Sequence, residues 1–215
     1  MRKLQRMLIG AVAAVIQVAN PGAGAQAQTV IEEWASAKLP SPPALKPATL
    51  VPNETALLVM DFTNQTCTKE RRPRCADSVA KVRDLVTQAR AKGTLIIYSV
   101  AVPNSVPADI LKELTPAAGE LVLPPLGPDK FIGSDLEKTL KDKGIKTVVA
   151  MGTQAQTSVL HTAGAAALRG FKVIVPVDGM SADDVFPELY TAWHLTTAAR
   201  ISPQVTLTKF DLIKL

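Results

Sequence analysis

The sequence predicts a three-layer α/β/α fold with a mainly parallel central sheet. Short apolar runs alternate with stretches of helical spacing of roughly 10 to 17 residues, which is the pattern of βαβ units. Hydrophobic residues make up 47% of the 215 residues, but aromatic residues only 4%. The core must therefore be built mainly from Val, Leu, Ile and Ala, which suit strands buried on both faces beneath Ala-rich helices.

Residues 1–25 have the features of a secretory signal peptide. Arg2, Lys3 and Arg6 form a positive start, and the apolar run over 7–18 is too short to span a membrane comfortably. Small residues then form cleavage patterns after position 25 and after position 27. We expect a periplasmic or secreted protein with no membrane association after cleavage; an uncleaved anchor is the alternative.

Residues 28–52 are rich in proline, which excludes a regular helix or a central strand. We expect an extended arm here, with room for a short helical turn over 31–38. The remaining chain, residues 53–215, has the length of one ordinary domain.

The elements of this domain follow in order. Residues 55–61 form a continuous apolar run that ends in a carboxylate, as expected of a buried strand that opens onto a site. Residues 103–130 are broken by several prolines and should be irregular, apart from a short helix near 108–114. Further strands are predicted over 95–100, 147–152, 171–177 and 205–208. Capping and stop signals predict helices over 77–92, 134–143, 157–169 and 184–199.

The charge balance gives no support to nucleic-acid binding. Basic residues outnumber acidic ones by 24 to 19, but three of the basic residues lie in the signal segment, and no basic stripe is evident. One loop is locally basic. It is either a solvated surface or, because it follows Asp61 closely, it leans over a pocket and favours an anionic substrate; its cations are Lys69, Arg71, Arg72 and Arg74.

The two cysteines, Cys67 and Cys75, lie close together in that polar loop. In an exported protein this spacing suggests a disulfide. Free thiols or a metal pair are the alternatives, but a metal would need further ligands, and only His161 and His194 are available. We interpret both histidines as structural and expect neither a metal nor a cofactor.

Three side chains are candidates for chemistry: Asp61, Lys130 and Ser158. A carboxylate at the end of an apolar strand is costly unless it is solvated or paired. Ser158 lies near the start of a predicted helix, where free N–H groups stabilise negative charge. Each has an ordinary interpretation too, since serine caps many helices and an Asp–Lys pair can be purely structural.

Taken together, these segments resemble the isochorismatase-like, or cysteine hydrolase, superfamily. The run 56–64 is similar to its first-strand motif, and Lys130 with Phe131 to its catalytic-lysine segment. The stretch 152–163 is similar to its nucleophile turn, and 170–178 to the strand that follows. The resemblance covers residues 55–182 and implies an isochorismatase-like fold, hydrolysis of a small-molecule substrate and a homo-oligomer.

The resemblance also implies roles for individual residues. Asp61 would accept and donate protons, Lys130 would hold Asp61 and stabilise developing charge, and the residue at position 158 would attack a carbonyl carbon. A non-proline cis peptide would lie at Thr153–Gln154. Substrate contacts would come from Asn64, Gln154, Ala155 and Gln156.

The sequence departs from the family at position 158, where Ser158 replaces the nucleophilic cysteine. A serine hydroxyl is less acidic than a thiol and needs a base within hydrogen-bond reach. Three functions stay open: a serine-dependent amidase or other C–N hydrolase, vinyl ether hydrolysis with Asp61 as general acid, and small-molecule binding without catalysis. Residues 99–131 contain no histidine, which argues against a catalytic metal and against nicotinamidase activity.

Overall fold

The computed structural model describes residues 29–101 and 103–215. The predicted signal peptide, residues 1–25, lies outside the described residues. The described residues 29–39 and 40–215 belong to two separate units. In the first unit the described part holds the short helix α1 (Val30–Glu33). Among the described residues, no helix combines the length and the apolar character needed to cross a bilayer.

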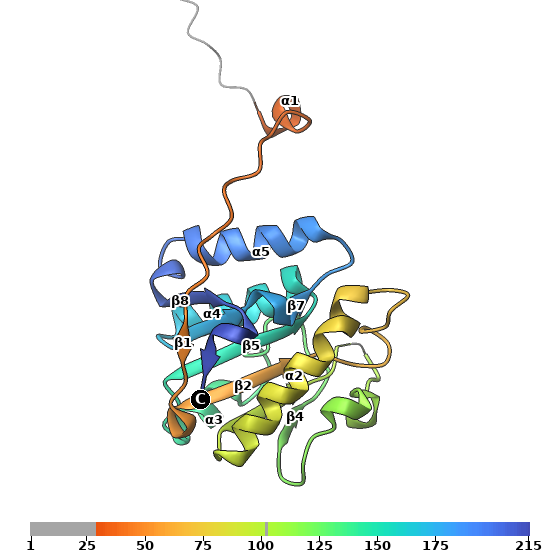
Figure 1. Cartoon of the computed structure of the whole chain (residues 1–215), viewed down its shortest axis with the longest axis vertical. Helices are drawn as coiled ribbons and strands as arrows, with labels where there is room; N and C mark the ends of the chain where they lie inside the picture. Colours follow the sequence, from red (N-terminus) through yellow and green to blue (C-terminus); the bar gives the residue numbers. More distant parts are fainter. Residues whose placement is uncertain (1–28, 102) are drawn as a thin grey trace, which may run out of the picture. The chain divides into compact units, whose positions relative to one another are not determined.

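The second unit has the predicted fold class, because its central sheet is built from parallel strands (Figure 1). The short strand β7 (Met180–Ser181) adds to the end of β5. Every residue of β2 is buried, as expected for a strand covered on both faces. The order across the sheet is β4 (Leu121–Leu123), β3 (Leu95–Ser99), β2 (Thr55–Met60), β5 (Thr147–Thr153), β6 (Lys172–Pro176) and β8 (Val205–Thr208).

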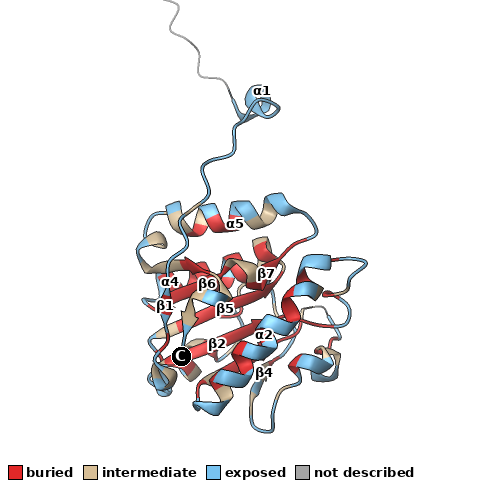
Figure 2. Cartoon of the chain, in the orientation of Figure 1, coloured by how far each residue is buried: buried red, intermediate tan, exposed pale blue. Residues whose placement is uncertain are grey.

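Helices cover both faces of this sheet. Leu57 and Val59 of β2 pack in one apolar cluster with α2, while Leu58 and Met60 pack in a second cluster on the opposite face. The sheet between the helices is almost continuously buried, whereas the helices expose their outer surfaces (Figure 2). The helix of the first face is α2 (Pro73–Ala91), and those of the second are α3 (Leu136–Asp142), α4 (Leu160–Leu168) and α5 (Val185–Thr197).

Several element boundaries differ from the predictions. α2 begins at Pro73 rather than at residue 77, because proline fits the first helical position; Cys75 therefore lies inside a helix. The helix predicted from residue 134 begins at Leu136 instead: Ser134 Oγ accepts the Leu136 N–H at 3.2 Å, and the Glu137 carboxylate pairs with basic side chains rather than capping the helix start. A π-helical turn, η4 (Ala155–Val159), precedes α4.

Very short elements were missed by the sequence analysis. β1 (Ala48–Thr49) pairs in parallel with β9 (Ile213–Lys214), and β4 lies at the sheet edge between prolines. Two or three residues are too few to produce a periodic pattern. Single 3₁₀ turns complete the unit: η1 (Pro52–Glu54), η2 (Pro107–Asp109), η3 (Lys112–Leu114), η5 (Val177–Gly179), η6 (Ser202–Gln204) and η7 (Phe210–Leu212).

The disulfide predicted between Cys67 and Cys75 is present. It joins the loop after β2 to the first turn of α2, and both cysteines are buried. The bond thereby closes a small loop that carries the basic residues identified in the sequence.

Replacing both cysteines with serine should lower the free energy of unfolding by about 2–3 kcal/mol, because the unfolded chain regains the freedom that this short loop removes. Urea unfolding of the oxidised wild type and the C67S/C75S variant measures the difference. A reducing agent should destabilise the wild type and leave the variant unchanged. Equal stability of the two oxidised proteins would contradict the prediction.

Candidate active site

The candidate site lies at the carboxyl ends of three neighbouring strands. Met60, the last residue of β2, is in register with Ser99 of β3 on one side and with Gly152 of β5 on the other. The residues that follow these strands therefore meet at one edge of the sheet. This edge is where ligands bind in open parallel α/β folds.

Gly152 allows β5 to approach β2 closely at this edge. Its φ is +153°, and a Cβ atom at this position would lie 2.2 Å from the Met60 carbonyl oxygen, closer than any real contact. The peptide bond Thr153–Gln154 that follows is cis, as predicted. The close approach of the two strands places the segment after β5 beside the end of β2.

The backbone of Asp61 is fixed from several directions. Its φ of 63° lies in the left-handed region, which Asp tolerates better than most residues. The Asp61 N–H donates to the Ser99 carbonyl at 3.1 Å, and the Asp61 carbonyl accepts the Thr63 N–H at 2.9 Å and Thr66 Oγ1 at 2.5 Å. The carboxylate therefore leaves the strand end in a defined direction.

The Asp61 carboxylate joins the three predicted catalytic residues. Lys130 Nζ lies 3.0 Å from Asp61 Oδ2, and Ser158 Oγ donates a hydrogen bond to the same oxygen. Ser99 Oγ donates to the other oxygen, Oδ1, at 2.6 Å. All four side chains are buried. The carboxylate thus faces one ammonium group and two hydroxyl donors.

Ser99 was not identified in the sequence analysis. The only available signal was its position as the polar residue near the end of the apolar run 95–100. Its role follows from the pairing of β3 with β2, which places it beside Asp61.

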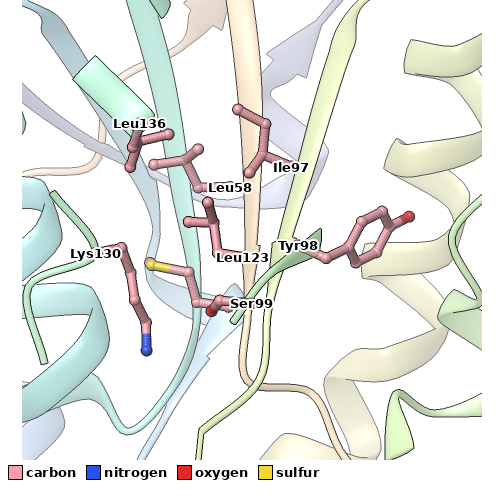
Figure 3. Close-up of a pocket in the computed structure, with 8 residues that line it drawn as sticks. Leu58, Ile97, Tyr98, Ser99, Leu123, Lys130 and Leu136 are labelled. Carbon is pink, nitrogen blue, oxygen red and sulfur yellow. The ribbon is translucent and has the colours of Figure 1, made fainter. Parts of the chain in front are cut away.

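Lys130 reaches Asp61 from a loop that is tied to α4 and to the segment just before α3. The Lys130 N–H donates to Thr162 Oγ1 of α4 at 3.2 Å, and Ser134 Oγ donates to the Lys130 carbonyl at 2.6 Å. The stem lines a very small cavity of about 10 Å³ with apolar side chains that include Leu58 and Leu136. Figure 3 shows Nζ at the end that points away from Leu136. The stem is therefore packed while its charge reaches the site.

Ser158 lies in the π-helical turn η4, which replaces the first turn of the helix predicted from residue 157. The Gln154 carbonyl accepts the N–H groups of Thr157 and Val159, at 3.1 and 3.3 Å. The Ser158 hydroxyl donates to Asp61 and makes no helix-capping hydrogen bond. Of the two interpretations of Ser158, the structure therefore favours the one in which its side chain faces the site.

A cleft of about 390 Å³ opens beside this cluster. Gln154 is among its lining residues, but Asn64, Ala155 and Gln156 are not; Asn64 is exposed and Ala155 is fully buried. The lining residues come from four separate segments: Asp61, Thr66, Arg71, Arg72, Ala101, Leu126, Gly127, Pro128, Lys130, Thr153, Gln154, Thr157 and Ser158.

One wall of the cleft is held by Arg72, whose side chain is only 2% exposed. Arg72 Nε donates to Asp183 Oδ1 at 2.7 Å, and its Nη1 donates to the Thr66 carbonyl at 2.9 Å. Gln154 Nε2 donates to Asp183 Oδ2 at 2.8 Å. Asp183, which the sequence analysis did not identify, therefore links the disulfide loop to the turn that contains the cis peptide.

The histidines lie apart from the cleft lining: His161 is exposed on α4, and His194 Nδ1 lies 3.4 Å from the Tyr190 hydroxyl on α5. Across residues 29–101 and 103–215, no group of three or more His, Cys, Asp or Glu side chains could hold a metal ion.

Known proteins resemble this chain in both sequence and fold. The family model described as the isochorismatase domain matches residues 55–206. A secreted isochorismatase effector of Verticillium dahliae is 28% identical over 149 residues, which cover 65% of this chain and 78% of that protein. Streptothricin hydrolase of Streptomyces noursei is 27% identical over 139 residues, which cover 60% of this chain but only 55% of that protein.

Solved structures show the same fold. N-carbamoylsarcosine amidase from Thermoplasma acidophilum superposes with a TM-score of 0.62 and 25% identity, covering 74% of this chain and 97% of that one. An isochorismatase family protein from Desulfovibrio vulgaris gives a TM-score of 0.66 at 20% identity, covering 74% and 95% of the two chains.

Proposed function

Because the chain belongs to the isochorismatase family, we propose that it is an exported hydrolase that cleaves an amide or another C–N bond of a small molecule. Asp61, Lys130 and Ser158 are its catalytic residues. The observation that carries this proposal is the hydrogen bond from Ser158 Oγ to Asp61 Oδ2, the oxygen that Lys130 Nζ approaches to 3.0 Å. A weak nucleophile thus has a base in direct contact.

In the acylation step, Ser158 Oγ attacks the substrate carbonyl carbon while its proton passes to Asp61. The carbonyl oxygen gains negative charge, which N–H groups of the turn η4 stabilise where Thr157 and Ser158 line the cleft. The intermediate then collapses, the C–N bond breaks, and the amine leaves with the proton from Asp61. The result is an acyl ester on Ser158.

In the deacylation step, water replaces the amine. Asp61 accepts a proton from the water as its oxygen attacks the ester, and returns that proton to Ser158 Oγ when the acid leaves. The Lys130 ammonium group balances the charge of Asp61 while that group is ionised, and the negative charge of the tetrahedral intermediate while Asp61 holds the proton. A thiolate needs no base, whereas a serine hydroxyl does. Ser158 can take the place of cysteine because its base, Asp61, is already in contact with it.

Export is the second part of the proposal. It is supported by the signal-like residues 1–25, by the disulfide between Cys67 and Cys75, and by a relative whose name describes it as secreted. The location we propose is periplasmic or secreted.

The proposed C–N chemistry is supported by relatives named as a hydrolase and an amidase. Vinyl ether hydrolysis is the competing function, favoured by the relative named as an isochorismatase effector and by the absence of cysteine at position 158. That reaction needs a proton on Asp61 at the start. Asp61 is surrounded by hydrogen-bond donors, as suits a carboxylate that begins the reaction as a proton acceptor. This arrangement supports the C–N reaction.

Mass spectrometry tests the proposal through the acyl ester. The mature protein is mixed with panels of primary amides and of activated esters, and the Ser158 peptide should gain the mass of the acyl group. Ser158→Ala should remove the adduct, and Ser202→Ala, a serine outside the cleft lining, should keep it. Turnover of vinyl ethers by a fully active Ser158→Ala variant would instead establish the competing function.

A further inference from the structure

Among the charged side chains that line the cleft, the cations outnumber the anions. Three are cationic, Arg71, Arg72 and Lys130, and one is anionic, Asp61. Lys130 pairs with Asp61, and Arg72 pairs with Asp183 through its Nε at 2.7 Å. These two ion pairs leave Arg71 as the lining residue whose positive charge is not balanced by a carboxylate of its own.

Arg71 has few partners of its own within the part of the chain that the structure describes. Its Nη1 donates to the Gln65 carbonyl at 3.3 Å. Its Nε lies 3.9 Å from Asp183 Oδ1, beyond hydrogen-bond distance, and that oxygen already accepts Arg72 Nε. The side chain is 55% exposed. A guanidinium group has five N–H donors, so Arg71 retains donors for a ligand.

The loop that presents Arg71 is rigidly built. The disulfide closes residues 67–75. Inside the loop, the Arg71 N–H donates to Thr68 Oγ1 at 3.2 Å, and the Arg72 N–H donates to the Thr68 carbonyl at 2.7 Å. The buried guanidinium of Arg72 anchors the loop to Thr66. Arg72 is therefore a positioning residue, and Arg71 is held where it lines the cleft.

We propose that the substrate is a small amide that also carries a carboxylate, and that Arg71 binds this carboxylate while Ser158 attacks the amide carbonyl. This inference rests on the proposed function for the identity of the reacting group. The planar fork of arginine matches a carboxylate through two parallel hydrogen bonds. Both residues line one cleft of about 390 Å³, so the two ends of the substrate are separated by a short spacer.

Matched compounds test this pairing. Malonamate, succinamate and glutaramate each carry a carboxylate where propionamide, butyramide and valeramide carry a methyl group. Ammonia release by the mature protein should give a kcat/KM about 10- to 100-fold higher for the best carboxylate than for its neutral partner, as expected for a charged hydrogen-bonded pair. Arg71→Gln should reduce this preference to about threefold or less, with little effect on the neutral amides.

Lys69→Gln is the matched control, because it removes the same charge from the same loop at an exposed residue outside the cleft lining. It should keep the preference. Lack of a preference in the wild type, or equal losses in the Arg71→Gln and Lys69→Gln variants, would overturn the role of Arg71.

A binding measurement separates failure of this inference from failure of the proposed function. If none of the six compounds is hydrolysed, the proposed reaction fails for these amides. The carboxylates should still raise the melting temperature of the wild type and not that of Arg71→Gln. Absence of that difference would overturn carboxylate binding.

Discussion

Replacing Asp61 with Asn should lower kcat/KM for amide hydrolysis by about 10³-fold or more, because the variant keeps the shape of the side chain but cannot take the proton of Ser158. Asn has one oxygen that still accepts a hydrogen bond, but its NH2 group cannot accept one. The variant therefore also loses the contact from Ser99 or from Ser158, and a control has to separate that loss from the loss of proton transfer. Steady-state ammonia release on the best substrate of the panel measures the fall in kcat/KM.

Ser99→Ala is the matched control for this prediction. Ser99 Oγ donates to Asp61 Oδ1, whereas the Ser158 hydroxyl contacts Oδ2. Loss of the Ser99 hydrogen bond should reduce kcat/KM by only about 10-fold, the scale of one hydrogen bond to a charged group. Comparable losses in both variants would mean that Asp61 serves to orient its neighbours, and the assignment of Asp61 as the base would be wrong.

The sequence was sufficient for the fold class because the central strands are long and apolar. β2 and β5 read as continuous hydrophobic runs, since both of their faces are covered by helices. The polar residues after those runs, Asp61 and Ser158, could then be placed at one sheet edge without knowing any contact. Lys130 was placed by family resemblance alone, because it lies in an irregular, proline-rich segment.

The remaining parts of the site depend on contacts between distant segments. Arg72 and Asp183 are 111 residues apart, and their pairing is set by how the disulfide loop packs against the end of β7. No local pattern encodes that distance. The π-helical turn at Ser158 could not be predicted from the sequence either, because its residues are equally suited to the first turn of an ordinary α-helix.

Lys130→Met should lower the free energy of unfolding by about 3–5 kcal/mol, the scale for removing one partner of a buried ion pair. Asp61 is 1% exposed, so its carboxylate would lose its cation without gaining water. Met keeps most of the length of the lysine stem, which lines the small cavity together with Leu58 and Leu136 (Figure 3). The stability loss would therefore reflect charge rather than a cavity. Urea unfolding measures it.

A double-mutant cycle with Asp61→Asn separates the pair from other effects of each substitution. In the D61N/K130M variant neither charge is left unpaired, so its loss should be smaller than the two single losses added, by at least about 2 kcal/mol. Lys146→Met is the surface control: Lys146 pairs with Glu54 at 2.5 Å, but its side chain is 68% exposed, and we expect a change below about 1 kcal/mol. If the attraction between Lys130 and Asp61 offsets the cost of burying their charges, the two substitutions must show a coupling energy. Strictly additive losses would therefore show that the two residues stabilise the fold independently.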